Sequence, residues 1–305
     1  MNASRHLSRL IGTRTRRIAA ASVTACAGSL ILASSALANW NTVKSGGSPN
    51  ANSEETLYII VSWVALFVFL AVEGALVYAI WRFRAKKNPV ATQIHGNTKV
   101  ELGLTAAAAG VLVVLAAATF ITLPSIVNPP NSDASAGTVL SASTESPNPP
   151  SGKTLDVCVL GRQFIWKYVY GKGCNDSQFA KHLPYSYQKM VAPAGVTVRL
   201  IIQSSDVIHA WWVPELGGKV DAEPGYTTYS WFKATQAGKT YAGQCAQLCG
   251  RGHAFMTALV QTVTPSQYQT WIANQTKAIS AQNNQVGQLR KSLEKSGGLT
   301  SSGTF

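Results

Sequence analysis

The sequence predicts a mixed fold: a two-helix transmembrane hairpin, then an all-β sandwich, then a C-terminal helix. Two long apolar runs flank a short basic loop in the first half of the chain. Short runs that alternate apolar and polar residues follow a Pro/Ser/Ala-rich linker, and Gly, Pro and Asn separate them, as is typical of sandwich strands. The last part of the chain begins with apolar residues at helical spacing.

The first 38 residues predict an export signal. They contain five arginines and no acid, and an apolar run of small residues ends at Ala38, where cleavage is expected. Cleavage would lower the formal net charge of the chain from +13 to +8. Three alternatives stay open: a twin-arginine signal at Arg16-Arg17, lipoprotein cleavage at Cys26, and an uncut segment that forms an extra span.

Residues 39–56 are predicted to be a polar outer leader, and residues 57–124 the membrane hairpin. The apolar runs at 57–81 and 100–123 are each long enough to cross a hydrocarbon core about 30 Å thick, and Pro124 is expected to stop the second. The basic residues between them are Arg82, Arg84, Lys86, Lys87 and Lys99. Because a basic loop stays in the cytoplasm, we expect a bacterial inner-membrane protein whose C-terminal domain lies on the periplasmic or outer face.

The part of the chain after the hairpin divides into three. Residues 125–152 are predicted to be a linker with little prospect of a core, and residues 153–264 to form the sandwich. Residues 265–305 are predicted to hold a helix, to about residue 294, and a flexible tail. The expected strands lie at residues 154–160, 164–170, 196–203, 227–234, 239–243 and 257–264. The hairpin is interpreted as an anchor docked on a larger membrane partner.

One glycine-rich loop gathers metal-binding side chains: Cys245, Cys249, His253 and Met256. Soft sulfur donors select copper, zinc or iron–sulfur centres, imidazole suits copper and zinc, and a thioether as weak ligand points to copper electron transfer. Because a second cysteine is present, we predict two copper ions bridged by two thiolates, with one histidine for each metal. His209 is the candidate for the second histidine.

Two alternatives compete with copper at this loop. Paired cysteines in an exported domain are most often a disulfide, but a disulfide needs neither His253 nor Met256. Zinc is disfavoured because a thioether is not a usual zinc ligand. His209 taken alone could equally be a histidine of the core.

Five motifs occur in order along residues 55–272. They are His95-Gly96-Asn97-Thr98 with Glu101, the run from Gly161 to Trp166, the run from Asp206 to His209, the run from Gly217 to Gly225, and the metal loop. Together they resemble subunit II of the haem-copper cytochrome c oxidases, which carries a binuclear copper A centre. The resemblance implies that the sandwich is a cupredoxin-like Greek key.

The resemblance also implies a ligand set and a function. The implied ligands are the bridging thiolates of Cys245 and Cys249, the imidazoles of His209 and His253, the thioether of Met256 and the backbone carbonyl of Gln247. The implied function is to accept electrons from a periplasmic donor, a cytochrome c or a small copper protein, and to pass them to haem in subunit I. Oxygen reduction and proton pumping belong to that partner. Other oxidase subunits are expected as partners, and nucleic acid is not.

Gln247 departs from the family, which has Glu at this position. In the family the carboxylate also reaches a magnesium ion at the boundary with subunit I, where hard and preferably anionic oxygens are wanted. The backbone carbonyl that would face copper does not depend on the side chain. We therefore predict an intact copper site and a magnesium site that is weakened, lost or recruited differently.

Two further roles follow from the resemblance. In the family the first aromatic residue after Gly-x-Gln, a Trp, receives electrons; here that position is Phe164, and Trp166 is expected two residues along on the same strand face. Trp166 could be a relay or a core residue. Glu101 matches the acid at the entrance of one proton path in the catalytic subunit, although an acid also suits the start of a helix.

Charge predicts the kind of donor. From Asn128 onward the chain has nine acids and fifteen lysines and arginines. The family's donor patch is typically acidic and complementary to lysine-rich cytochromes c, whereas Lys167 and Val169 occupy the region expected to contribute to it. We therefore expect an apolar contact, or a neutral or acidic partner, rather than a strongly basic cytochrome c.

Cys158 and Cys174 are predicted to form a disulfide in an oxidising compartment. The alternative function for the whole chain is a membrane-anchored copper-binding or assembly module without electron-transfer turnover. A quinol oxidase subunit is disfavoured because that class lacks the cysteine pair of the metal loop. A nitrous oxide reductase would need a separate multi-copper domain.

Overall fold

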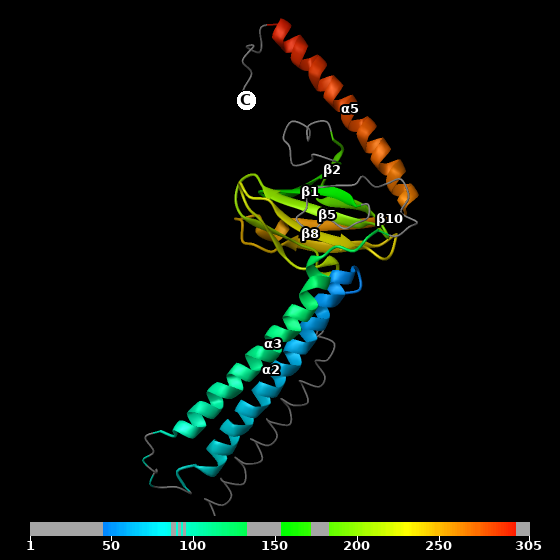
Figure 1. Ribbon diagram of the computed structural model, residues 1–305. Coiled ribbons are helices and arrows are strands. Elements are labelled where there is room, and N and C mark those ends of the chain that lie inside the picture. Colours follow the sequence, from blue (N-terminus) through cyan, green and yellow to red (C-terminus); the bar gives the residue numbers. More distant parts are fainter. Residues whose placement is uncertain are drawn as a thin grey trace, which may run out of the picture. The chain divides into compact units, whose positions relative to one another are not determined.

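The computed structural model describes residues 45–86, 90, 93, 96–132, 154–171 and 183–296. The predicted signal, most of the predicted linker and the tail after residue 296 lie outside them, as do His95 and Cys174. The described part contains two long helices, a β-sandwich of two sheets and a C-terminal helix (Figure 1). The predicted fold class is confirmed.

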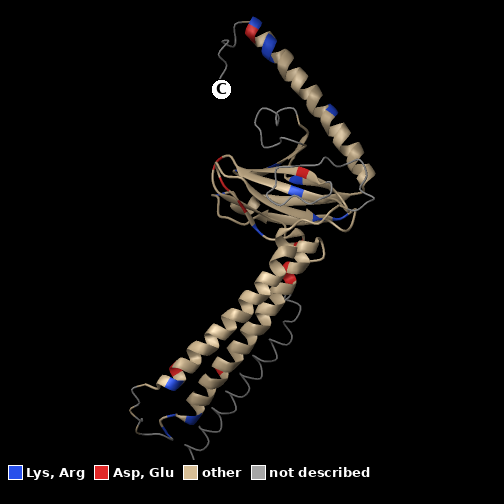
Figure 2. Cartoon of the chain, in the orientation of Figure 1, with Lys and Arg blue, Asp and Glu red and all other residues tan. Residues whose placement is uncertain are grey.

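Helices α2 (Pro49–Arg82) and α3 (Thr98–Val127) are both long and apolar enough to cross a membrane. They pack against each other, and their outer surfaces expose large apolar side chains such as Phe67 and Phe120. Basic residues gather where α2 ends and α3 begins, at the predicted cytoplasmic loop (Figure 2). Apolar surface all round a helix suits lipid or a neighbouring membrane subunit.

Helix α2 begins at Pro49, well before the predicted start at residue 57, so part of the expected outer leader is helical. Proline is favoured at the first position of a helix because its fixed φ suits the turn and its missing N–H is not needed there. The first turns are also anchored to the sandwich. The amide of Asn50 donates to the carbonyl of Trp231 (2.9 Å), and Glu54 accepts from the N–H of Gly218 (2.8 Å).

Pro124 does not stop the second span, contrary to expectation. It lies inside α3, which continues to Val127. Proline removes its own N–H from the helix, but its carbonyl still accepts the N–H of Asn128 (3.0 Å). The indole of Trp231 donates to the carbonyl of Ile126 (2.9 Å), which holds this last turn against the sandwich.

The sandwich consists of two five-stranded sheets. In spatial order the first sheet contains β3 (Tyr185–Tyr187), β2 (Ile165–Tyr170), β1 (Leu155–Arg162), β5 (Thr197–Ser204) and β8 (Thr228–Lys233). The second contains β4 (Lys189–Pro193), β10 (Thr257–Val263), β9 (Thr240–Cys245), β6 (His209–Trp212) and β7 (Val220–Ala222). The six expected strands correspond to β1, β2, β5, β8, β9 and β10. The strands β3, β4, β6 and β7 were not predicted, because three to five residues are too few to show an alternating pattern.

The core between the sheets is rich in aromatic side chains. Trp211 on β6 is 1% exposed, and its indole donates to the hydroxyl of Tyr168 on β2 (3.3 Å). The ring of Phe232 on β8 stacks on Trp211 with centroids 6.5 Å apart. Because Trp211 is the register partner of Cys245, this packing holds β6 and β9 together at the start of the metal loop.

Helix α5 (Pro265–Lys295) confirms the predicted C-terminal helix. Its start is closed by a capping box, in which Thr264 accepts from the N–H of Gln267 and the side chain of Gln267 accepts from the N–H of Thr264. Trp271 in its second turn packs edge-on against Tyr170, with centroids 5.0 Å apart.

Candidate metal centre

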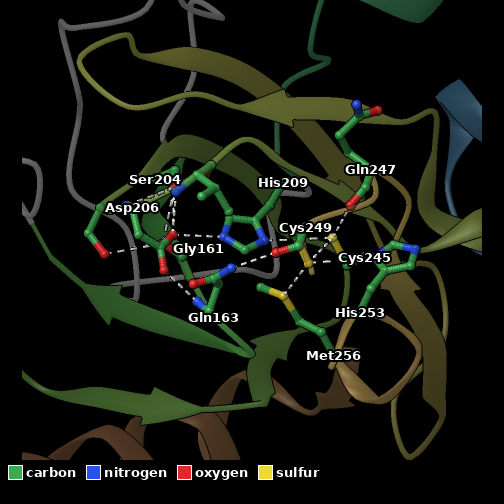
Figure 3. Close-up of polar contacts among 12 residues, drawn as sticks. Gly161, Gln163, Ser204, Asp206, His209, Cys245, Gln247, Cys249, His253 and Met256 are labelled. Atoms are coloured by element: carbon green, nitrogen blue, oxygen red, sulfur yellow. Dashed lines mark hydrogen bonds and ion pairs between the residues drawn. The ribbon is translucent and has the colours of Figure 1, made fainter. Parts of the chain in front are cut away.

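Two free thiols lie at the centre of the site (Figure 3). Cys245 is the last residue of β9 and Cys249 lies in the loop that follows, and both are buried. Their sulfur atoms are 3.9 Å apart, whereas the bond of a disulfide is about 2.05 Å long. Cys245 and Cys249 therefore do not form the disulfide that was the alternative for this loop.

Each thiol has its own imidazole. His209, the first residue of β6, is fully buried, and its Nδ1 lies 3.8 Å from Sγ of Cys245. His253, in the short helix η4 (His253–Phe255), places its Nδ1 3.6 Å from Sγ of Cys249. The structure thus brings His209 to the metal loop from a different strand, as expected.

Each thiol also has one weak donor nearby. The carbonyl oxygen of Gln247 lies 3.2 Å from Sγ of Cys245, and Sδ of Met256 lies 4.0 Å from Sγ of Cys249. All six predicted ligand residues therefore meet in one place (Figure 3).

This donor set fits copper. The ligand atoms of His209, Cys245 and Cys249 all lie within 4.8 Å of one another. Two thiols, two imidazoles and a thioether are the ligands that select copper among the common metals, whereas magnesium and calcium want oxygen. Because the donors divide into two sets, each of one thiol, one imidazole and one weak ligand, they fit two metal ions better than one.

Asp206 orients His209. Its Oδ1 lies 2.9 Å from Nε2 of the imidazole, so that Nδ1 is the ring nitrogen that faces Cys245. Burial by itself would raise the pKa of Asp206, but hydrogen bonds from the N–H of Gln163, from His209 and from the N–H of Val207 outweigh it and lower the pKa to about 2. The carboxylate is therefore ionised when it holds the imidazole.

Gln163, in the turn between β1 and β2, joins the two halves of the site. Its side-chain amide donates to the carbonyl of Cys249 (2.6 Å), and its backbone N–H donates to Oδ2 of Asp206 (2.7 Å). One residue thus contacts both the metal loop and the residue that orients His209. A side chain at Gly252 would come within 2.4 Å of the Phe164 ring, so this turn fits against the loop only because glycine is there.

Burial, together with the neighbouring Cys245, raises the pKa of the Cys249 thiol to about 11. In the chain alone this thiol is therefore neutral. A metal cation reverses that preference, because a coordinating thiol is deprotonated.

Comparison with known proteins places this geometry in a family. Residues 155–263 match the family "Cytochrome C oxidase subunit II, periplasmic domain", and residues 37–122 match "Cytochrome C oxidase subunit II, transmembrane domain". The probable cytochrome c oxidase subunit 2 of Rickettsia prowazekii (strain Madrid E) is 31% identical over 239 residues, which cover 74% of this chain and 69% of that protein. The chain belongs to the cytochrome c oxidase subunit II family.

The chain is also similar to another curated protein and to a solved structure. The probable cytochrome c oxidase subunit 2 of Rickettsia bellii (strain RML369-C) is 28% identical over 253 residues, which cover 78% of this chain and 86% of that protein. The crystal structure of the periplasmic domain of subunit II of cytochrome oxidase of Bradyrhizobium japonicum is 28% identical and covers 41% of this chain and 95% of that chain, with a TM-score of 0.37.

The two aromatic residues of this subunit II differ in exposure. Phe164 is 37% exposed, and its ring lies against Gly250 and Gly252 of the metal loop. Trp166 is fully buried in β2, and its ring meets that of His209 edge-on with centroids 5.8 Å apart. The expectation that both share a strand face was wrong, because Phe164 belongs to the turn and β2 begins at Ile165.

The remaining predicted residues lie away from the metal centre. Glu101 accepts the N–H of Asn97 (3.2 Å) at the start of α3, as an acid that stabilises a helix start would, and its role in a proton path stays a prediction. Cys158 on β1 is disulfide-bonded. Its pairing with Cys174 stays a prediction, because Cys174 lies outside the described residues.

No role was predicted from the sequence for Gln163 or Asp206, although both belong to motifs that carry the family resemblance. A carboxylate three residues before a candidate metal-binding histidine is a signal that could have identified Asp206, since such histidines usually give their second nitrogen to a carboxylate or carbonyl. Gln163 had no such signal, because its partner Cys249 is far away in the sequence.

Replacing Gln163 by Met tests the link between the two halves of the site. The variant keeps the size of the side chain and the backbone bond to Asp206, but removes the donor to the carbonyl of Cys249, a hydrogen bond that is part-buried. We expect a loss of about 1 kcal/mol in the free energy of unfolding and a changed visible spectrum of the copper-loaded chain.

The matched control is Gln275→Met, because Gln275 also donates its amide to a backbone carbonyl, that of Tyr185, at 2.6 Å. It should lower stability by a similar amount without changing the copper spectrum. Equal spectra for both variants would contradict a special role for Gln163.

Proposed function

We propose that this chain is the electron-accepting subunit of a haem-copper oxidase, with two copper ions held by its outer domain. It would take electrons one at a time from a soluble donor and deliver them to haem in subunit I. The observation that carries the proposal is the meeting of two Cys–His pairs, Cys245 with His209 and Cys249 with His253, whose free sulfur atoms lie 3.9 Å apart.

The residues of the chain would prepare the site for fast transfer. When bound, the copper pair supplies one-electron chemistry in which the charge is shared between two metals and two sulfurs. Burial of His209, Cys245 and Cys249 keeps water away from the donors. Asp206 holds one imidazole in place, and the two strands beneath the loop are packed into the core. Little has to move when the charge changes, which lowers the barrier to transfer.

We place the soluble domain on the periplasmic face of a bacterial inner membrane. The support is the basic loop between α2 and α3, which the positive-inside rule assigns to the cytoplasm. The hairpin would then dock on subunit I, and the apolar surfaces of α2 and α3 offer the contact.

The surface around the metal loop supports a particular kind of donor. Leu248 and Phe255, both in the metal loop, are 78% and 80% exposed, and Phe164 provides apolar surface beside the loop. Two exposed charged residues nearby in sequence are Arg162 and Arg251. The carboxylate in the same region, Asp206, is already engaged with His209. We therefore propose that electrons enter over Phe164 from a neutral or acidic protein.

A second candidate function is a copper-binding or assembly module that never turns over. The same ligands would support it, because thiols, imidazole and thioether also bind monovalent copper. The two functions differ in whether the two metal ions share an unpaired electron.

The paramagnetic resonance spectrum of the copper-loaded, full-length chain separates these functions. We expect the spectrum of one unpaired electron shared by two copper nuclei. Cys249→Ser should abolish this sharing, because it removes one of the two bridging sulfurs. Met256→Leu should keep the sharing, because only a weak ligand is lost. A spectrum of isolated copper ions, or exchangeable monovalent copper without a shared electron, would support the assembly module.

The proposed donor type is tested by the rate at which a lysine-rich cytochrome c reduces the complex at different ionic strengths. We expect a slow rate at low salt that does not fall as salt is added, because like charges repel across this surface. Arg251→Glu should raise the low-salt rate by about tenfold, and Lys277→Glu on α5 should leave it unchanged. A fast rate that falls steeply with salt in the unaltered protein would refute the proposal.

Magnesium content tests the role of Gln247, whose side chain is exposed and neutral. We expect less than one magnesium ion per purified oxidase, because a neutral amide is a weaker ligand than a carboxylate. Gln247→Glu should raise the content toward one ion, and Gln244→Glu, at another exposed position nearby, should not. Full occupancy in the unaltered complex would argue against the prediction.

A further inference from the structure

The imidazole ring of His209 has close neighbours on three sides. Asp206 lies 2.9 Å from Nε2, and Nδ1 faces the thiols of the metal loop. The third side is closed by Trp166 and Gly161. Neither of these two offers a side-chain atom that binds a metal, so their contacts with the ring need a different explanation from those of the ligands.

Trp166 contacts His209 through its ring. It is fully buried on β2, and the two rings meet edge-on with centroids 5.8 Å apart and planes at 66°. Aromatic rings in this arrangement attract each other beyond the area that they bury. Among the described residues, the indole N–H of Trp166 has no hydrogen-bond partner. Because an unpaired buried donor costs free energy, the contacts of the ring, and not a hydrogen bond, explain what the indole contributes here.

Gly161 leaves the space in which the two rings meet. It is the register partner of Trp166 in the pairing of β1 with β2. A Cβ atom at this position would lie 3.0 Å from Cδ2 of His209 and 3.0 Å from Cζ3 of Trp166, which is closer than carbon atoms pack favourably. Both rings are fully buried and cannot easily move away. The two rings therefore fit beside this strand only because the residue is glycine.

The backbone of Gly161 also contacts the segment that leads to His209 (Figure 3). Its carbonyl accepts the N–H of Ser205 at 3.1 Å and the hydroxyl of Ser204 at 3.4 Å. These two residues directly precede Asp206, whose carboxylate lies beside Nε2 of the imidazole. The end of β1 thus fixes the backbone before His209 as well as the space beside its ring.

We propose that Trp166 is a positioning residue that fixes the plane of the His209 imidazole, and that Gly161 provides the room for this contact. The proposal rests on the proposed function, because the plane of the ring matters only if its nitrogen binds copper. The lone pair of that nitrogen lies in the ring plane, so the angle of the ring decides how well it points at a metal. Groups behind a metal-binding histidine commonly set this angle.

Replacing Trp166 by Leu in the full-length, copper-loaded chain tests the proposal. Electron–nuclear double resonance measures the nitrogen couplings of the two imidazoles. We expect one coupling to change and the other to stay, because His253 lies on the opposite side of the two thiols from His209 (Figure 3). We also expect copper to bind about tenfold more weakly, as when a group that orients a metal ligand is removed.

The matched control is Trp231→Leu. Trp231 is also buried in the sandwich, but its indole donates to the carbonyl of Ile126 at the end of α3. This variant loses the same side-chain atoms and should leave both nitrogen couplings unchanged. Unchanged couplings in Trp166→Leu, or equal changes in both variants, would overturn the proposal.

Gly161→Ala tests the same contact by crowding it. The added methyl group should change the coupling of the same imidazole and weaken copper binding. Combined with Trp166→Leu, the loss of affinity should be smaller than the product of the two single losses, because removal of the indole makes room for the methyl group. If the two losses simply multiply, the residues act independently and the proposal fails.

These measurements separate the proposal from the proposed function. Isolated copper ions in place of a shared electron would refute the electron-accepting role, but the nitrogen coupling would still report how the ring of His209 is held. If the chain bound no copper, unfolding of the metal-free variants in denaturant would decide. Additive losses of stability for Gly161→Ala and Trp166→Leu would then overturn the shared contact, and non-additive losses would support it.

Discussion

The antiparallel pairing of β6 with β9 is the constraint on which the metal centre depends. Trp211 faces Cys245 in this register, and His209, two residues before Trp211, therefore lies beside the same cysteine. A shift of the register by one residue would turn every side chain of β6 to the other face of the sheet. The buried ring of Trp211 prevents that shift, since it is enclosed by the core between the sheets.

Hydrogen bonds connect a third segment, the turn between β1 and β2, to this pair of strands. The turn between β1 and β2 contacts the metal loop through Gln163 and the β5–β6 connection through Asp206. The site is thus enclosed by backbone segments from both sheets. Such an arrangement suits a carrier of electrons, because a site that is already ordered has little to rearrange when its charge changes. The same turn presents Phe164 at the surface, next to the buried donors.

Local sequence was sufficient wherever the interacting residues are close together in the chain. The metal loop contains Cys245, Cys249, His253 and Met256 within twelve residues, so a metal site with these ligand types could be predicted from the sequence alone. The six longer strands and α5 were also predictable from their spacing. The errors at Pro49 and Pro124 have one physical cause. Both ends of the hairpin are held by contacts with Trp231, which hydropathy does not reveal.

The sequence by itself determined the membrane hairpin, the sandwich and the donor types of the metal loop, because each depends on composition and short-range spacing. Only the tertiary structure decided which distant residues join the loop. His209 reaches Cys245 through sheet register, Gln163 reaches Cys249 through a turn of the other sheet, and Trp166 is buried while Phe164 stays exposed. These contacts depend on how strands from separate parts of the chain pair and pack. A local sequence pattern does not show which distant segments come together.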